Sequence, residues 1–245
     1  DLKYCRNLCT AHWDPQDDPF AWRDRLPFAR WGLAELLIMG GPLVAATIAA
    51  ALWWWPAALV PGALAALVIS FFRDPHRPVP QEVDQIVAPA DGKLVEITHL
   101  EDDPFIGGPA VRIGIFLSVF NVHINRSPVR ARVLRMAYHP GLFLNALAPE
   151  SALRNEAMWI GLESLEGTPR RLIVRQIAGL LARRIVCALR PGEEIERGGR
   201  FGMIKLGSRT ELILPAEPGL RIAAQLGQTV YAGRTVLAAW PEEGR

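Results

Sequence analysis

Residues 33–72 read LAELLIMGGPLVAATIAAALWWWPAALVPGALAALVISFF, and Glu35 is the single charged side chain among them. The remainder of the 245-residue chain carries charges every few positions. The part from Leu33 to Trp55 is long enough to cross a hydrocarbon core of about 30 Å as a helix. Pro56 then interrupts the pattern, and residues 57–72 form a second, slightly shorter apolar run. These residues predict an N-terminal helical hairpin.

The flanks of this hairpin favour a membrane. Three tryptophans, residues 53–55, stand at the break, and indole rings prefer the membrane interface. Basic residues precede and follow the apolar runs, which by the positive-inside rule places both ends on the cytoplasmic side of the cell membrane. Two alternatives stay open: a buried helix pair in a soluble fold, and a first helix that Gly40, Gly41 and Pro42 turn back within one leaflet. The basic flanking residues are Arg23, Arg25 and Arg30 before the hairpin, and Arg73, His76 and Arg77 after it.

Composition limits the partners and the compartment that the chain can have. The balance of 27 basic against 25 acidic residues gives a net charge of +2, which argues against nucleic acid as a partner. Three cysteines are too few for a disulfide scaffold and fit a reducing compartment. Cys5, Cys9 and His12 have helical spacing but lack a fourth ligand, so no metal is expected. The predicted organisation is a polar extension over residues 1–31, the membrane hairpin over 32–72 and one further domain over 73–245.

That further domain is predicted to be mainly β, an antiparallel sandwich or barrel-like fold. Short apolar runs alternate with Gly and Pro at regular spacing, as in such folds. Residues 144–158 are the exception and are predicted to form a surface helix or loop. The expected strands are 86–88, 93–97, 111–117, 131–137, 171–176, 184–189, 203–206, 210–214 and 235–239.

One internal echo stands out. Residues 192–198 (GEEIERG) and 227–233 (GQTVYAG) share the pattern G-[EQ]-x-[IV]-x-x-G at a distance of 35 residues. Similar turns occur in lipoyl- and biotinyl-type β domains, where glycine lets the chain reverse before a strand. Those domains carry a modified lysine at a hairpin tip, and no equivalent lysine is found here. A swinging-arm carrier is therefore disfavoured.

Three polar residues beside apolar runs could carry chemistry: Asp91, His123 and Ser208. An Asp can orient a His, the His can move a proton, and the Ser oxygen can then react. Each also has a structural interpretation. Asp91-Gly92 suits a hairpin turn, a single His after a strand is usually structural, and Ser208 after Gly207 suits a turn. The residues alone leave both interpretations open.

Four motifs occur in order: FFRDPHR at 71–77, APADG at 88–92, VHINRSPV at 122–129 and FGMIKLGSR at 201–209. Together they resemble the short bacterial and archaeal form of the phosphatidylserine decarboxylase proenzyme family, over about three quarters of the chain. Arg154-Asn155-Glu156-Ala157 departs from the family pattern, which usually has a basic residue after Asn-Glu.

The resemblance implies that the chain cuts itself between Gly207 and Ser208, with His123 as base and Asp91 as its orienting partner. Ser208 would become a covalent pyruvoyl cofactor, which decarboxylates phosphatidylserine to phosphatidylethanolamine through a Schiff base. Residues 1–207 and 208–245 would then form a heterodimer, alone or further homo-oligomerised. The implied partners are a phospholipid substrate and the membrane.

Arg126, Arg130 and Arg132 follow His123 closely and are candidate contacts for the lipid phosphate. Their alternative interpretation is a solvated basic face near anionic lipid. Two rival functions also stay open. One is a membrane-anchored serine hydrolase that uses Asp91, His123 and Ser208 without self-cleavage. The other is a non-enzymatic β module tethered to a membrane.

Overall fold

The computed structural model describes residues 18–82, 84–148, 150–180, 184–205 and 207–241. The described residues fall into two compact units. One comprises residues 18–76 with the short segment 119–122 and is called the hairpin unit. The other comprises the described residues of 77–118 and 123–241 and is called the β-domain. Each unit is described by itself.

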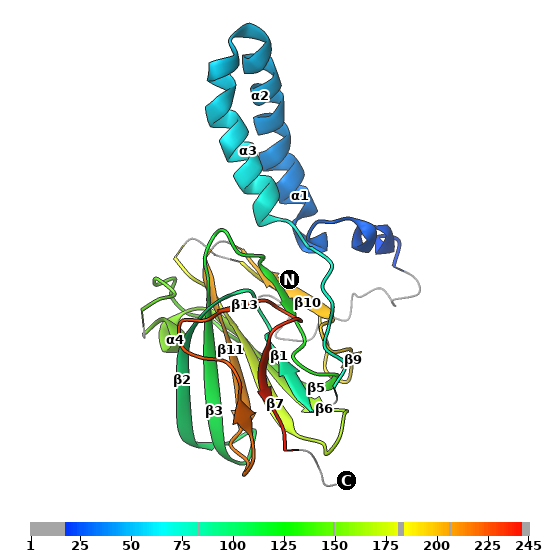
Figure 1. Cartoon of the computed structure of the whole chain (residues 1–245), viewed down its shortest axis with the longest axis vertical. Coiled ribbons are helices and arrows are strands. Elements are labelled where there is room, and N and C mark those ends of the chain that lie inside the picture. Colours follow the sequence, from blue (N-terminus) through cyan, green and yellow to red (C-terminus); the bar gives the residue numbers. More distant parts are fainter. Residues whose placement is uncertain (1–17, 83, 149, 181–183, 206, 242–245) are drawn as a thin grey trace. The chain divides into compact units, whose positions relative to one another are not determined.

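The hairpin unit consists of two antiparallel apolar helices (Figure 1). The helix that spans Arg30–Trp53 is the one described helix long and apolar enough to cross a membrane, and the second, Trp55–Phe71, is shorter. Only 6% of the most apolar window of the first helix is buried. In order, the segments are η1 (Ala21–Arg25), η2 (Arg30–Gly32), α1 (Leu33–Glu35), the π-helical η3 (Leu36–Gly40), α2 (Gly41–Trp53), η4 (Trp55–Ala58) and α3 (Leu59–Phe71).

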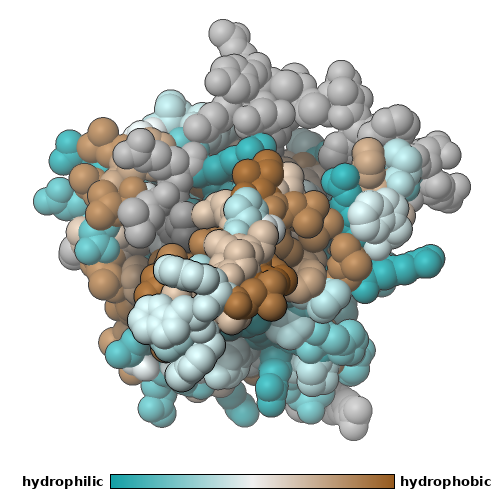
Figure 2. Space-filling model, turned by 90° about the horizontal axis from the view of Figure 1, so that it is seen from above, coloured by the Kyte–Doolittle hydropathy of each residue, from teal (hydrophilic) through white to brown (hydrophobic). Residues whose placement is uncertain are grey.

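The side chains of this hairpin point outward. Leu52 and Trp53 near its tip are 84% and 86% exposed. Seen end-on in Figure 2, apolar side chains dominate its surface. A soluble protein rarely exposes an apolar surface of this extent, so the exposure argues against the alternative of a buried helix pair.

The β-domain is built on a curled antiparallel sheet of eight strands, in the order β13-β2-β3-β11-β7-β6-β5-β9 (Figure 1). Two three-stranded sheets, β1-β14-β12 and β4-β10-β8, complete it. The mainly β prediction is thereby confirmed. The bounds are β1 (Gln85–Val87), β2 (Gly92–Asp103), β3 (Gly108–Leu117), β4 (Ile124–Arg126), β5 (Ala131–His139), α4 (Ser151–Arg154), β6 (Ala157–Ser164), β7 (Arg171–Ile177), β8 (Ile185–Cys187), β9 (Glu194–Ile195), β10 (Arg200–Ile204), β11 (Ser208–Pro215), β12 (Arg221–Ile222), β13 (Thr229–Val230) and β14 (Val236–Ala239).

All nine expected strands overlap strands of the structure. The prediction for residues 144–158 is wrong at its C-terminal end, because Ala157 and Met158 begin β6. Within that stretch only the single turn α4 is helical, and Ser151, Ala152 and Asn155 are buried rather than on the surface. The segment therefore packs against the β-domain instead of lying over it as a solvated loop.

Strand β11 is the centre of the main sheet. It pairs with β3 along its whole length and with β7 over Arg209–Ile213, and all eight of its residues are buried. Because side chains alternate across a strand, Leu212 and Leu214 enter the main core while Ile213 joins a smaller cluster with Ala110 and Ile173.

Ionised side chains of four adjacent strands lie on the Arg209 face of β11. Arg209 donates to Glu96 and, through Nε at 2.9 Å, to Glu211. Arg112 completes the pairing of Glu96, and Arg175 donates to Glu211 at 2.7 Å. Glu211 itself is completely buried. Gly114 leaves space for this arrangement, since a Cβ there would lie 2.6 Å from the Arg209 guanidinium.

The β-domain is also an internal two-fold repeat. One half contains β1–β3 and β11–β14, and the other contains β4–β10, so that each half supplies four strands of the main sheet and one three-stranded sheet. The halves exchange matching hydrogen bonds, Val87 N to Pro128 O and Arg126 N to Pro89 O, both 3.0 Å. Both halves carry a register shift at the same place, between Leu94 and Glu96 in one and between 133 and 135 in the other.

The sequence echo marks equivalent turns of these two halves. Gly192 donates to Val133 O at 2.7 Å, and Gly227 donates to Leu94 O at 2.8 Å. The second glycines of the two motifs repeat the match, with Gly198 N bonded to Ser127 O and Gly233 N bonded to Ala88 O, both at 2.8 Å. The pattern thus belongs to the fold rather than to a carrier site.

The buried charges on β11 generate a prediction for stability. Replacing Glu211 by Gln leaves Arg209 and Arg175 with less compensation, and breaking a buried ion pair destabilises by about 3–5 kcal/mol. We expect that loss in the free energy of unfolding, measured by urea denaturation. The matched control is Glu194→Gln, which removes a solvent-exposed pair with Arg132 and should change the free energy of unfolding far less. Equal losses for the two variants would contradict the importance assigned to the β11 charges.

Candidate active site

Ser208 is the first residue of β11, and its position is fixed by pairing with Leu117 of β3. Its side chain is completely buried, and Oγ has no hydrogen-bond partner among the described residues. Gly207 precedes it with a φ of +62°, a left-handed backbone that favours glycine. A buried hydroxyl without a partner is uncommon in a folded protein, and such a group often marks a reactive site.

Buried amide side chains line the domain two residues further along the same face of β11. Asn125 donates to Thr210 Oγ1 at 3.1 Å and to Pro89 O at 3.3 Å. Gln176, paired with Thr210 in the sheet, donates to Asn125 Oδ1 at 2.9 Å. Asn125, Thr210 and Gln176 are all completely buried, so this network ties β4, β7 and β11 together beneath Ser208.

The three candidate residues lie at one end of the β-domain. Ser208 pairs with Leu117, and Gly92, which follows Asp91, packs against the carbonyl of Phe116. His123 O accepts a hydrogen bond from Ile204 N at 3.3 Å, four residues before Ser208, and the His123 side chain is completely buried. The three residues are 117 positions apart from first to last in the sequence, and their roles stay predictions.

The Asp91 carboxylate is held by an arginine and a backbone amide, and Asp91 does not lie in a hairpin turn. It precedes β2, whose first residue pairs with Val230 of β13, so the interpretation of Asp91-Gly92 as a two-residue hairpin turn is wrong. One carboxylate oxygen accepts from Arg77 at 2.7 Å and the other from Ala232 N at 2.8 Å. Burial raises the pKa of Asp91, although the Arg77 ion pair and the Ala232 amide oppose the rise. The proposed contact of Asp91 with His123 stays a prediction.

Of the three candidate phosphate ligands, Arg130 and Arg132 lie far from Ser208, whereas Arg126 lies near Asp91. Arg126 is buried, donates to Gly198 O at 3.1 Å and lowers the pKa of Asp91 through its charge. Arg130 and Arg132 instead form ion pairs with acidic residues of the β9 turn. The strand pairing places the start of β5 across β6 from the first residue of β7, Arg171. Ser208 lies beyond the last residue of β7, because Arg209 pairs with Ile177. At about 3.3 Å per residue, β7 separates these ends by roughly 20 Å.

The internal repeat explains this separation. The segment that contains Asp91 corresponds to residues 127–131, so Arg130 takes the place of Asp91 in the other half. By the same registers Arg170, which bonds Ser164, takes the place of Ser208. Arg170 forms an ion pair with Glu217 at 2.7 Å. One end of the repeat thus carries the candidate residues Asp91 and Ser208, and the other carries arginines in ion pairs.

Sequence reasoning missed Arg77 as the partner of Asp91, although it lies in the quoted motif 71–77, and it missed the network of Asn125, Gln176 and Thr210. A polar residue inside an apolar run, such as Gln176 in β7, was the available signal. Within the described ranges, no cluster of three His, Cys, Asp or Glu side chains could hold a metal ion. The Cys5, Cys9 and His12 group lies outside the described residues.

The β-domain thus has a buried serine after a left-handed glycine, with a buried histidine and a buried carboxylate at the same end. Comparison with known proteins identifies the family. The family model for phosphatidylserine decarboxylase matches residues 64–238, and this chain belongs to that family.

Curated relatives support the assignment along the whole chain. A phosphatidylserine decarboxylase proenzyme of Rhodopirellula baltica is 52% identical over 241 residues, which cover 98% of this chain and 100% of the relative. Proteins of the same name from Nitrosomonas eutropha and Symbiobacterium thermophilum are each 43% identical over 202 residues. These matches cover 82% of this chain and 90% and 92% of the relatives.

The Asp91–Arg77 pair generates a prediction for pH dependence. Arg77 opposes the upward shift that burial imposes on the pKa of Asp91, so Arg77→Gln should raise that pKa further. If self-cleavage needs the carboxylate, its rate falls as pH drops through this pKa, and the acidic limb moves to higher pH in the variant. The measurement is the initial rate of precursor cleavage against pH. Arg170→Gln, which removes a similarly buried arginine from the opposite end, should leave the limb in place, and an unmoved limb in Arg77→Gln would exclude ionised Asp91 from the reaction.

Proposed function

We propose that the chain is a precursor that cuts itself between Gly207 and Ser208 and then decarboxylates phosphatidylserine to phosphatidylethanolamine. The observation that carries this proposal is the buried, unpartnered Oγ of Ser208 directly after a left-handed glycine. The family assignment and the word proenzyme in the names of the relatives support it.

Burial of Ser208 also distinguishes this function from a serine hydrolase. A hydrolase must present its serine to an incoming substrate in the uncut chain, whereas a self-cleaving serine needs at first to reach only the adjacent peptide bond. A lipid substrate would meet residue 208 only after cleavage has freed the new chain end. Ser208 is completely buried, so the adjacent Gly207 carbonyl is the natural target. The non-enzymatic β module is disfavoured because it gives no role to the cluster of Ser208, His123 and Asp91.

Self-cleavage would begin when His123 accepts the hydroxyl proton of Ser208 and Oγ attacks the carbonyl carbon of Gly207. The C–N bond breaks, which leaves Gly207 in an ester with Oγ and a free amine on Ser208. Loss of the Ser208 α-proton then expels the Gly207 carboxylate. Tautomerisation and addition of water release ammonia and leave a ketone carbonyl at residue 208. Cleavage consumes one water and needs no oxidant.

The pyruvoyl group so formed would supply the electron sink that α-decarboxylation of an amine requires. The surroundings of Ser208 would fit this group, because its hydroxyl makes no hydrogen bond with the described residues that would be lost and its side chain is buried before cleavage. His123 is the residue that we expect to return a proton to the substrate carbon. The network of Asn125, Thr210 and Gln176 would keep the start of β11 in place during the reaction.

The test of this function is a paired measurement of cleavage and carbon dioxide release from phosphatidylserine. Ser208→Ala should stay whole and inactive, because no oxygen remains to attack Gly207. His123→Ala should lose cleavage by at least about 100-fold, the range for removal of a general base. Ser151→Ala, which alters another buried serine of the β-domain, is the matched control and should be cut and active. Normal processing of Ser208→Ala would rule out this cleavage site.

We further propose that the hairpin unit anchors the protein in the cell membrane with the β-domain on the cytoplasmic side. The outward-facing apolar helices and the tryptophan tip support membrane attachment, and the basic flanks support the orientation. A diacyl substrate stays in the bilayer, so an anchored enzyme would meet it there. Deleting residues 1–72 should release the protein from sedimenting vesicles, and undiminished sedimentation would place the anchor elsewhere.

A further inference from the structure

The scissile carbonyl has an unusual neighbour in the β-domain. An ideal Cβ built on Gly179 would lie 2.1 Å from Gly207 O and 3.0 Å from Gly207 C. Both distances are far inside van der Waals contact, and the atoms met belong to the backbone. The backbone of Gly179 is outside the left-handed region that glycine favours. Glycine is therefore required at position 179 by the closeness of the Gly207 carbonyl rather than by its own conformation.

The segment that carries Gly179 is held by a buried amide. Asn155 is 3% exposed and donates from Nδ2 to Ala178 O at 2.8 Å and to Leu144 O at 2.9 Å. Its Oδ1 accepts from Leu144 N at 2.8 Å. Ala178 N in turn donates to Glu156 O at 2.9 Å, so Ala178 is fixed through both of its backbone polar groups.

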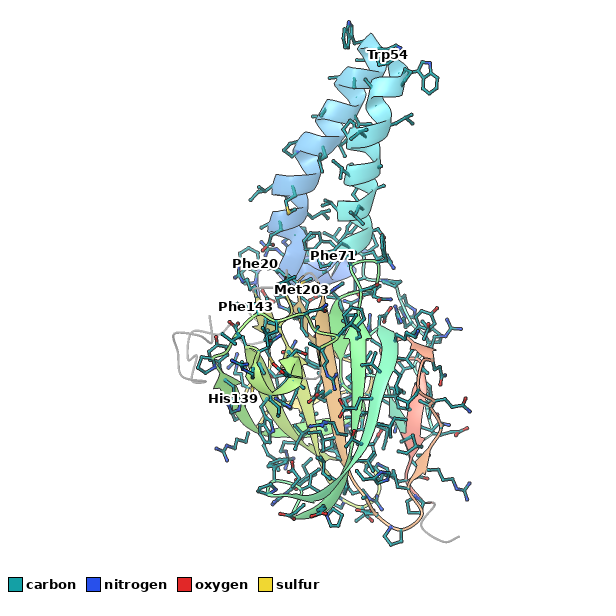
Figure 3. The ribbon with its side chains drawn as sticks, turned by 90° about the vertical axis from the view of Figure 1, so that its left-hand side faces the viewer. Phe20, Trp54, Phe71, His139, Phe143 and Met203 are labelled. Carbon is teal, nitrogen blue, oxygen red and sulfur yellow. The ribbon has the colours of Figure 1, made fainter. Side chains whose placement is uncertain are left out.

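The same amide brings a third segment to this place. Asn155 fixes Leu144, and the Cβ of Ala146, two residues later, lies 3.3 Å from the Cβ position of Gly179. Figure 3 shows Phe143 at the same end of the β-domain as Met203 of β10, the strand that leads to the cleavage site. Gly179 thus follows a residue, Ala178, that is held by hydrogen bonds, and its Cβ position faces both Ala146 and the Gly207 carbonyl.

We propose that Gly179, held in place by Asn155, is a positioning residue that sets the Gly207 carbonyl in line for attack by Ser208 Oγ. The inference rests on the proposed self-cleavage at this bond. A displacement of about 1 Å between reacting atoms can slow a reaction about 100-fold. A methyl group on Gly179 must push the carbonyl by a comparable amount, because the hydrogen bonds of Ala178 to Asn155 and Glu156 hold the segment that carries Gly179.

The first experiment measures the cleavage rate of the full-length Gly179→Ala precursor. We expect cleavage about 100-fold slower than in the wild type. Hydroxylamine, which cuts esters, identifies the slowed step. Because the variant is impaired in forming the ester between Gly207 and Ser208 Oγ, hydroxylamine should not restore its cleavage. A wild-type rate, or restoration of cleavage by hydroxylamine, would overturn the proposal.

A matched variant separates positioning from general damage. Gly161 of β6 is also crowded, but by side chains, since a Cβ there would lie 2.5 Å from the Phe105 ring and 2.6 Å from the Trp159 ring. Gly161→Ala should lower the thermal unfolding midpoint while its folded fraction is cut at close to the wild-type rate. Unfolding of both variants is compared in the uncut Ser208→Ala background. Equal cleavage defects for equal stability losses would contradict a specific role of Gly179.

A second variant keeps the proposal testable if Gly179→Ala does not fold. Asn155→Asp keeps the size and the acceptor but removes the donors to Ala178 and Leu144, so it should slow cleavage while hydroxylamine again fails to restore it. Normal cleavage of Asn155→Asp would overturn the proposal that Asn155 holds Gly179 in place against the Gly207 carbonyl. A wild-type chain that never cuts would instead refute the proposed function itself, so the two failures are distinguishable.

Discussion

Strand β11 is hydrogen-bonded along both edges and buried on both faces, and the β-domain depends on it. Its neighbours β3 and β7 come from different halves of the internal repeat, so β11 joins the halves. One face feeds leucines into the core and the other carries the alternating charges of Arg209 and Glu211. Its first residue is Ser208. A reactive residue at this position is fixed by the packing of the whole sheet.

The position of Ser208 at the start of β11 would keep the two fragments together after self-cleavage. A cut before Ser208 leaves a fragment of residues 208–245, which is too short to keep a fold alone. The fragment begins with a central strand, however, and also supplies β12, β13 and β14. Ser208–Pro215 would stay paired with β3, and the Arg209 pair with Glu96 would still join the two fragments. The broken peptide bond would therefore free the new chain end without loosening the domain.

The two halves of the internal repeat share a backbone arrangement but differ in the residues at their equivalent ends. Both halves have the same strand order and the same glycine turns. Asp91 and Ser208 in one half correspond to Arg130 and Arg170 in the other. The arginines form ion pairs with Glu194, Glu196 and Glu217, which close their end of the frame. In the first half, a buried hydroxyl that has no hydrogen-bond partner among the described residues lies next to the Gly207–Ser208 bond.

The sequence predicted the β-rich class and the separation of the apolar hairpin, because period-two runs and uninterrupted apolar runs are local signals. Ordered motifs also singled out Ser208, His123 and Asp91 as candidates, which lie at one end of the β-domain and whose roles stay predictions. It could not place Arg130 and Arg132, which are close to His123 in sequence yet lie across the length of β7 from Ser208. Gly179 was equally hidden, since a close approach between Gly179 and Gly207 depends on tertiary packing. The strand β6 was missed because its apolar start was read as the end of the preceding segment.

Intact-mass spectrometry of the denatured wild-type protein shows whether the chain cuts itself between Gly207 and Ser208. We expect two fragments that part between Gly207 and Ser208, the smaller one with a blocked N-terminus that reacts with a carbonyl reagent. A single full-length mass after prolonged incubation of folded protein, or a cut at another bond, would contradict this expectation.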